Sequence, residues 1–249
     1  MTRRGAKTNI ALLAFLCAAF LTGWLAFAFA TSAARTSLLI HAVSGFAILL
    51  LLPWKSMVAR RGLNRPRAAR WLSIVFSVLV LASLAAGLAH SSGVLLAVGP
   101  ITAMDVHVGA AIAAAPLAIW HIAARRIRLR TTDLSRRNFL RGGLVISGAT
   151  ATYAATELVV RATGLPGAAR RFTGSYESGS FQPELMPVSS WILDPIPEID
   201  AGMWRLSVDG REMTYQDLVA FDDQLTATLD CTGGFYSTQV WTGVRLDRL

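Results

Sequence analysis

The run TNIALLAFLCAAFLTGWLAFAFATSAA, which spans Thr8–Ala34, contains no charged side chain and determines the kind of fold that this chain can adopt. A helix that crosses a bilayer core requires about 20 consecutive apolar residues. A buried helix of a soluble bundle would carry a polar face, and this run has none. Further uncharged runs follow at Thr36–Trp54, Trp71–Met104 and Val106–Ala124. We therefore predict membrane-spanning helices near residues 9–30, 38–54, 71–90 and 105–124.

The overall composition agrees with a membrane protein. Of the 249 residues, 53% are hydrophobic and only 16% are charged, and the mean hydropathy of +0.48 is too high for an ordinary soluble domain. The net charge of +9 is unevenly distributed: residues 1–164 carry +15 and residues 165–249 carry −6. Because the basic residues gather between the apolar runs, they indicate membrane topology, and we expect no nucleic-acid partner.

The basic loops also predict the orientation. The N-terminus, the loop after the second helix and the segment after the fourth helix together carry 16 Lys and Arg, whereas the two loops on the other side carry only Arg35. Cytoplasmic loops are enriched in Lys and Arg. We therefore predict a multi-pass protein of the cytoplasmic (inner) membrane with its N-terminus in the cytoplasm and its basic loops against membrane lipid.

The sequence SRRNFLR at Ser135–Arg141 precedes Gly142–Thr156, a weakly apolar and uncharged stretch. It resembles a twin-arginine (Tat) signal, which the Tat export machinery reads in order to move folded, cofactor-loaded domains across the membrane. The resemblance implies that residues after about 163 lie outside the cytoplasm. We find no convincing cleavage site, so we assign residues 131–164 to the signal and a fifth helix that remains as an anchor.

All four histidines fall in or beside the predicted spans. The topology places His41, His90 and His107 near the outer face and His121 near the inner face. Ionisable groups at membrane depth are costly and mark functional sites. His107 and His121 are 14 residues apart and share one helix face. The residues between them on that face are all small: Ala110, Ala111, Ala114 and Ala118.

These runs resemble small four-helix membrane cytochromes b, in which histidines on two helices hold haem iron from both sides. The resemblance covers residues 1–130 and implies haem b with His41 and His107 as the iron ligands. Gly45, one turn after His41, clears space. His90 is the alternative ligand or a hydrogen-bond donor to a propionate. A second haem at His121 would require Met57, a partner subunit or five-coordinate iron.

The composition changes at Leu165, where Gly and Pro become more frequent. We assign residues 165–180 to a linker. Apolar and polar residues alternate in Trp204–Gly210, and the segment ends in Asp-Gly. This pattern predicts a strand that enters a turn. Thr214–Phe221 predicts a short helix capped by Thr214. Leu225–Asp230 predicts a strand that leads to Cys231, and a further helix is expected from Trp241.

Residues 181–249 also resemble the first part of the sulfite-oxidase family of molybdopterin-binding oxidoreductases. The similarity lies in DPIP at Asp194–Pro197, WRLSVDG at Trp204–Gly210, TATLDCTGGF at Thr226–Phe235 and WTGVRLDRL at Trp241–Leu249. It implies an incomplete α+β molybdopterin-binding domain in which Cys231 is the thiolate ligand of molybdenum. A soft thiolate suits such a centre.

The residues around Cys231 include further candidate site residues and a difference from sulfite oxidases. By loop position, the candidates that line the pterin site or contact the ligand are Ser189, Ser190, Trp191, Thr232 and Gly233. Sulfite oxidases carry asparagine and arginine after the cysteine, whereas this chain continues with Thr232–Phe235, so we do not expect sulfite as the substrate. Cys17 and Cys231 form neither a disulfide framework nor a multi-cysteine metal site.

Together these features predict an α-helical membrane bundle of four helices plus a fifth anchoring helix, followed by the incomplete α+β domain. The expected function is a membrane-anchored oxidoreductase that passes electrons between an outer molybdopterin centre and a membrane haem, with the quinone or quinol pool as partner and oxygen-atom transfer as its chemistry. The alternative is a non-enzymatic membrane cytochrome b electron carrier with an inactive outer domain. A third possibility is a structural membrane protein without haem.

Overall fold

The computed structural model describes residues 3–29, 31–63, 70–124, 133, 135–188 and 197–248. The chain divides into two compact units, Met1–Gly174 and Ser175–Leu249. The first unit is helical, and the second is built mainly from short strands. We call them the helical unit and the C-terminal unit and describe each by itself.

The helical unit contains five long helices, and each is long and apolar enough to cross a membrane. Their bounds are α1 Arg3–Ala28, α2 Ser32–Leu63, α3 Arg70–Ser92, α4 Ala103–Ala124 and α5 Arg136–Ala162. A small hairpin of β1 (Ala97–Val98) and β2 (Ile101–Thr102) connects α3 to α4. The predicted helical membrane bundle is therefore confirmed, and the chain is a multi-pass membrane protein by its helices.

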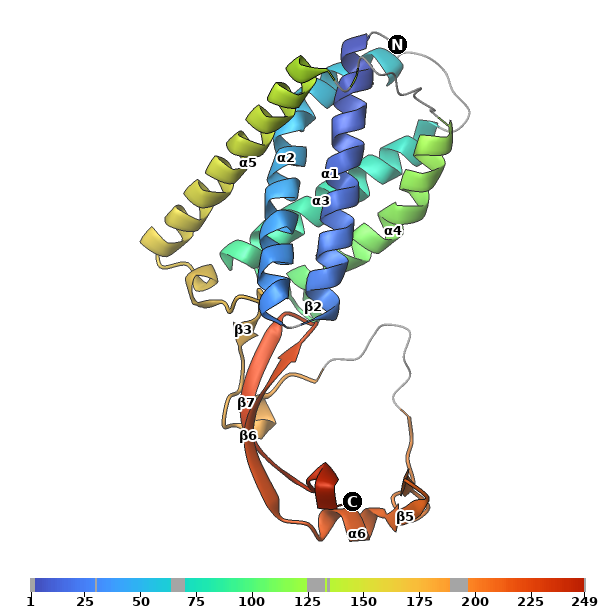
Figure 1. Cartoon of the computed structure of the whole chain (residues 1–249), viewed down its shortest axis with the longest axis vertical. Coiled ribbons are helices and arrows are strands. Elements are labelled where there is room, and N and C mark those ends of the chain that lie inside the picture. Colours follow the sequence, from blue (N-terminus) through green and yellow to red (C-terminus); the bar gives the residue numbers. More distant parts are fainter. Residues whose placement is uncertain are drawn as a thin grey trace. The chain divides into compact units, whose positions relative to one another are not determined.

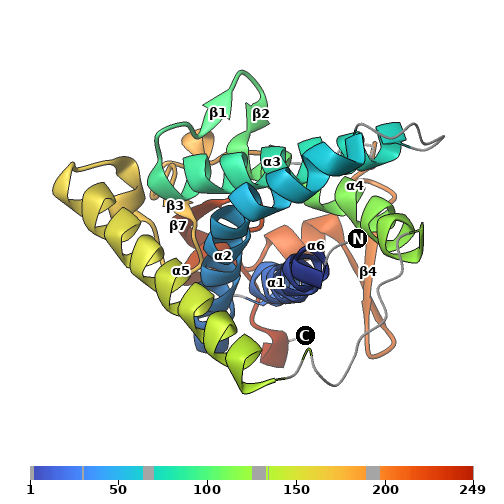
Figure 2. The same cartoon turned by 90° about the horizontal axis from the view of Figure 1, so that it is seen from above.

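The helices pack as two hairpins and an added helix. α1 lies along α2, α3 lies along α4, and α5 lies against α2 (Figure 1). Figure 2, which looks along α1, shows α3 and α5 inclined to it. The core cluster consists of Leu12, Ile48 and Leu51, with Leu84 of α3 and Val145 of α5 packed against it. Many other apolar side chains stay exposed, as expected for helices whose outer faces meet lipid.

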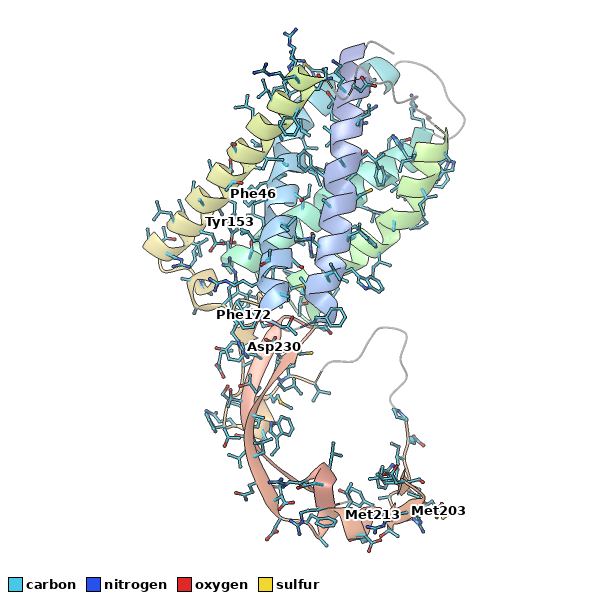
Figure 3. All side chains as sticks on the ribbon, in the orientation of Figure 1. Phe46, Tyr153, Phe172, Met203, Met213 and Asp230 are labelled. Atoms are coloured by element: carbon cyan, nitrogen blue, oxygen red, sulfur yellow. The ribbon has the colours of Figure 1, made fainter. Side chains whose placement is uncertain are left out.

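α5 packs into the bundle over much of its length. Ala149 and Val160 are buried, with exposed fractions of 0% and 2%. The Phe46 and Tyr153 rings meet between α2 and α5 with centroids 6.1 Å apart, as Figure 3 shows. The helix that follows Ser135–Arg141 is thus part of the bundle.

After α5 the chain closes back onto the end of α3. The 3₁₀ turn η2 (Pro166–Ala169) approaches so closely that a Cβ atom at Gly167 would lie 2.4 Å from the Ser91 carbonyl oxygen. The Arg170 guanidinium donates to that carbonyl at 2.6 Å and pairs with the Glu157 carboxylate. The two charged side chains are 14% and 22% exposed. We call the residues Pro166–Gly174 the latch.

The C-terminal unit contains two small sheets. The strands β3 (Tyr176–Glu177), β7 (Phe235–Gly243) and β6 (Asp223–Cys231) form one sheet in that order. The strands β4 (Arg205–Val208) and β5 (Arg211–Thr214) form the other. The helix α6 (Tyr215–Val219) follows β5, and the remaining elements are the 3₁₀ turns η3 (Pro183–Leu185) and η4 (Leu246–Arg248).

Most of the expected elements of this unit are confirmed. β4 ends in a turn in which Asp209 and Gly210 both have positive φ angles, 48° and 80°, the conformation that favours Asp-Gly in tight hairpins. Thr214 caps α6, and its hydroxyl accepts from the Asp217 N–H at 3.1 Å. In return, the Thr214 hydroxyl and N–H donate to the Asp217 carboxylate and lower the pKa of that group.

The helix expected from Trp241 is wrong. Trp241 lies within β7, where it pairs with Leu225 of β6, and only the single 3₁₀ turn η4 follows. The Trp241 indole N–H donates to the Ala227 carbonyl oxygen at 3.0 Å across the hairpin. These residues form a strand because the long antiparallel hairpin supplies hydrogen bonds to their backbone groups. The local sequence does not reveal this pairing.

The Arg170→Ala substitution should destabilise the helical unit by about 3–5 kcal/mol, because it leaves the Glu157 carboxylate largely buried without its cation. Thermal unfolding of the detergent-solubilised protein measures this effect. Arg245→Ala is the matched control, since Arg245 pairs with Asp247 at the surface and its side chain is 69% exposed. Equal melting temperatures for the two variants would show that the pair of Arg170 and Glu157 does not stabilise the helical unit.

Candidate functional site

The histidines His41 and His107 meet inside the helical unit. His41 lies on α2 and His107 on α4, near the end at which α1 joins α2 and α3 joins α4. Their ring centroids are 5.6 Å apart and their planes are inclined by 89°. The structure therefore brings together the two residues that the sequence analysis selected as a ligand pair.

His41 rests against α1. Its Nδ1 lies 2.7 Å from the Ala19 carbonyl oxygen. Gly23 is one turn further along α1, and a Cβ atom there would lie 2.8 Å from His41 Nδ1 and 2.9 Å from Cε1. Real Cβ atoms do not approach so closely, so only glycine at position 23 lets the imidazole reach the carbonyl.

His107 rests against α3 in the same way. Its Nδ1 lies 2.8 Å from the Ser83 carbonyl oxygen. Gly87 is again one turn further along the helix, and a Cβ atom there would lie 2.7 Å from His107 Nδ1 and 2.9 Å from Cε1. Each hairpin thus holds a histidine with a carbonyl at one position and a glycine four residues later. We call each of these pairs, Ala19–Gly23 and Ser83–Gly87, a glycine seat.

The glycine seats define the protonation of the two rings. A carbonyl oxygen only accepts a hydrogen bond, so Nδ1 of His41 and of His107 carries the proton and donates it. In a neutral imidazole the other nitrogen, Nε2, then carries the lone pair. This is the tautomer of a metal-ligating histidine, whose other ring nitrogen donates to a carbonyl or carboxylate.

The small face of α4 lies in the interior. Ala114 is buried, and Ala110, Ala111 and Ala118 are half-buried. On the opposite face, Ile119 is 70% exposed. Gly45, in contrast, does not clear space beside His41, because a Cβ atom there would be in ordinary contact with Leu84 at 3.7 Å.

The other two histidines have different environments. His90 is buried, and its Nε2 lies 3.0 Å from the Gly174 carbonyl oxygen of the latch. His121 is at the opposite end of α4, with Nδ1 3.4 Å from the Ser73 hydroxyl and its ring centroid 5.5 Å from that of Phe76.

The end of the bundle near His121 lacks an arrangement like the His41–His107 pair in the part of the chain that the structure describes. Fourteen residues after His41, α2 carries Lys55, which donates to the Asn9 side-chain oxygen at 2.9 Å. Met57, the protein partner considered for His121, is 54% exposed. The described residues therefore favour a single histidine pair, at the end where the helices of each hairpin connect.

Cys231 ends β6 at a three-residue loop. It pairs with Phe235 across the hairpin, and the Gly234 N–H donates to the Cys231 carbonyl oxygen at 3.0 Å. Gly234 has a φ of 87°, which favours glycine. The Gly233 N–H points at the Cys231 sulfur at 3.4 Å, and Thr232 is exposed. Ser189, Ser190 and Trp191 lie outside the described residues.

The glycine seats are the functional feature that sequence reasoning missed. The sequence positions contain a signal for them, because each glycine and its histidine lie equally far from the turn between their helices. Gly23 and His41 are equidistant from residue 32, and Gly87 and His107 are equidistant from residue 97. Residues at equal distances from a hairpin turn lie side by side in an antiparallel helix pair. A search for glycines at the mirror position of each histidine would have found both.

Comparison with known proteins adds no relationship, since the chain matches no family model, no curated protein and no solved structure.

The substitutions Gly23→Ala and Gly87→Ala should each destabilise the helical unit by about 1–3 kcal/mol, although alanine favours a helix over glycine, because the added methyl group displaces a histidine ring. Thermal unfolding in detergent measures the change. Gly109→Ala on α4 is the control, because a Cβ atom there meets nothing within 4 Å. If all three variants unfold at the same temperature, the histidine rings do not require glycine at positions 23 and 87.

Proposed function

We propose that the helical unit is a b-type cytochrome in which His41 and His107 hold one haem. The observation that carries this proposal is the pair of neighbouring, perpendicular imidazoles, each with Nδ1 bonded to a backbone carbonyl. Two half-buried imidazoles inside apolar helices are costly without a functional role. The tautomer that the glycine seats select leaves Nε2 of each ring with a lone pair for a metal ion.

The dimensions of the pair also fit haem. Two imidazoles that share one iron have ring centroids about 6 Å apart, because each metal–nitrogen bond is about 2 Å long. The His41 and His107 centroids are 5.6 Å apart. The two hairpins approach each other less closely than the helices within each hairpin do, and the more buried face of α4 carries alanines. A flat porphyrin needs such a small-residue wall.

The ligand set favours electron transfer. Haem supplies a one-electron redox centre when bound. With His41 and His107 both holding the iron, the protein would leave no position for an exchangeable ligand such as dioxygen. The surrounding helices are apolar. The protein thus orients two imidazoles among apolar helices, and the quinone or quinol pool of the membrane is the proposed redox partner.

The distribution of basic residues supports an orientation with this site in the outer half of the cytoplasmic membrane. His41 and His107 lie at the ends of α2 and α4 that are remote from the arginine-rich loops. The twin-arginine sequence supports export of the C-terminal unit. Arg136 and Arg137 are exposed at the start of α5, and Phe139 is 80% exposed, so a receptor has access to them.

We further propose that the exported unit carries a molybdopterin centre with Cys231 as its thiolate ligand. Cys231 is half-buried at the end of β6, beside glycines that let a bulky group approach the backbone. Cys231, Thr232 and Gly233 are the described residues that would contact the group. The chemistry would be oxygen-atom transfer, with electrons exchanged one at a time with the membrane site.

The alternative, a cytochrome b electron carrier without an active outer domain, is favoured by one observation. In the C-terminal unit, none of the apolar side chains that the structure describes is buried; its buried residues include Ser175, Ser237 and Gln239. A unit of this size with a polar centre gains little stability from the hydrophobic effect. The two candidates share the haem and differ only in molybdenum.

The purified protein should show a Soret band and one haem per chain by the pyridine haemochrome assay. His41→Ala and His107→Ala should each reduce the haem content well below one per chain, because each variant leaves only one histidine of the pair to hold the iron. His121→Ala is the matched control and should retain haem, since His121 lies at the far end of α4. A wild-type protein without a Soret band would rule out the cytochrome.

In a Cys17→Ser background, a membrane-impermeant maleimide should label Cys231 in intact spheroplasts, because the proposed orientation places the C-terminal unit outside. Cys17 lies within α1 and is replaced so that only one thiol remains. Spheroplasts lysed before labelling show the total reactive thiol. Labelling that occurs only after lysis would place the unit in the cytoplasm and overturn the orientation.

Cys231→Ser should remove bound molybdenum, measured by mass spectrometry of the exported protein, and leave the haem content unchanged. Thr228→Ala is the control; Thr228 lies on the same strand and its hydroxyl meets that of Thr238 at 2.8 Å. Molybdenum that persists in Cys231→Ser would refute the thiolate assignment. A wild-type protein with haem and no molybdenum would establish the carrier alternative.

A further inference from the structure

The two glycine seats have the same geometry, but the ligand on α4 has one additional polar neighbour. The Ser83 hydroxyl oxygen lies 3.2 Å from His107 Nδ1 and 3.0 Å from the His107 carbonyl oxygen. Ser83 is buried, with an exposed fraction of 9%. On α1 the corresponding residue is Ala19, which offers His41 its carbonyl oxygen and a methyl group.

The direction of these hydrogen bonds follows from the number of protons. A hydroxyl has one proton, and Ser83 donates it to the His107 carbonyl oxygen, which only accepts. Toward His107 Nδ1 the hydroxyl therefore accepts. The Nδ1–H of His107 is shared between two oxygens of Ser83, the carbonyl at 2.8 Å and the hydroxyl at 3.2 Å.

This bonding restricts the rotation of the His107 ring. The torsion between Cβ and the ring of a histidine is broad in the absence of contacts, so a defined ring plane needs an outside constraint. Two acceptors on one side and Gly87 beneath the ring supply that constraint. His41 is held by a different helix hairpin, and the two ring planes come to lie at 89°.

We propose that Ser83 is a positioning residue that holds the His107 ring perpendicular to His41 and makes His107 the stronger electron donor of the two iron ligands. The proposal rests on the haem assignment made above. Each acceptor at Nδ1–H draws the proton outward and increases electron donation from Nε2. A ligand that donates more electron density stabilises ferric over ferrous iron, so Ser83 would lower the reduction potential of the site.

Electron paramagnetic resonance measures a property that would not change if Ser83 only stabilised the fold. In low-spin ferric haem with two imidazole ligands, the spread of the g-values depends on the angle between the ring planes. Perpendicular planes give a highly anisotropic signal with a large maximal g-value, and parallel planes give a compact rhombic one. The wild-type protein should show the highly anisotropic signal.

The experiment compares the full-length wild type, Ser83→Ala, Ser83→Thr and Ser77→Ala. Ser77 is the control, because its hydroxyl donates to the Ser73 carbonyl oxygen of its own helix at 2.8 Å. In Ser83→Ala the haem content should persist, the g-values should shift, and the ratio of ferric to ferrous protein at a fixed ambient potential should fall by up to about fivefold, the size expected for one hydrogen bond. Ser83→Thr retains a hydroxyl and should restore the wild-type signal and potential.

The outcomes separate the two proposals. Wild-type protein without haem overturns the proposed cytochrome. Haem-loaded wild type with a compact rhombic signal overturns the perpendicular arrangement. Haem-loaded Ser83→Ala with unchanged g-values and an unchanged potential overturns the role of Ser83. If Ser83→Ala loses haem, recovery of haem and signal in Ser83→Thr supports that role, and failure of recovery overturns it.

Discussion

The helical unit depends on one constraint: an imidazole inside an apolar bundle needs a hydrogen-bond partner, and helix backbones offer few. Backbone carbonyls within a helix already accept from the N–H four residues later, and the side chain at that later position covers them. Glycine at position 23 or 87 uncovers the carbonyl of the preceding turn. The histidine on the neighbouring helix then reaches a second lone pair of that oxygen, and its own tautomer is determined by this bond.

The same constraint connects the histidine pair to the rest of the unit. Ser83, Gly87 and His90 lie at intervals of four and three residues and therefore share one face of α3. This face holds His107 at one end and the latch at the other, where His90 meets the Gly174 carbonyl oxygen. α3 thus links the candidate redox site to the segment that leads into the C-terminal unit. Gly93 and Gly167 allow the latch to lie directly on the end of this helix.

The C-terminal unit shows how far local patterns extend. The turn at Asp209–Gly210, the cap at Thr214 and the strand before Cys231 each depend on neighbouring residues, and each was predicted correctly. The end of the chain was not, because Trp241 belongs to a strand only through its pairing with Leu225, which is 16 positions earlier. Strand pairing is a property of two segments, and a single segment does not reveal it.

The sequence by itself determined that the chain crosses a membrane, since runs such as Thr8–Ala34 leave their polar backbone no alternative to a helix in lipid. It also led us to expect His41 and His107 as a pair, from their equal depth on the second and fourth predicted helices. Only the tertiary structure decided how the rings are held, because a seat requires a carbonyl on one helix, a missing Cβ four residues later and a histidine on another helix. Contacts between helices depend on their rotation about their own axes, and the hydrophobic pattern of a membrane helix that is apolar on all sides carries no signal for that rotation.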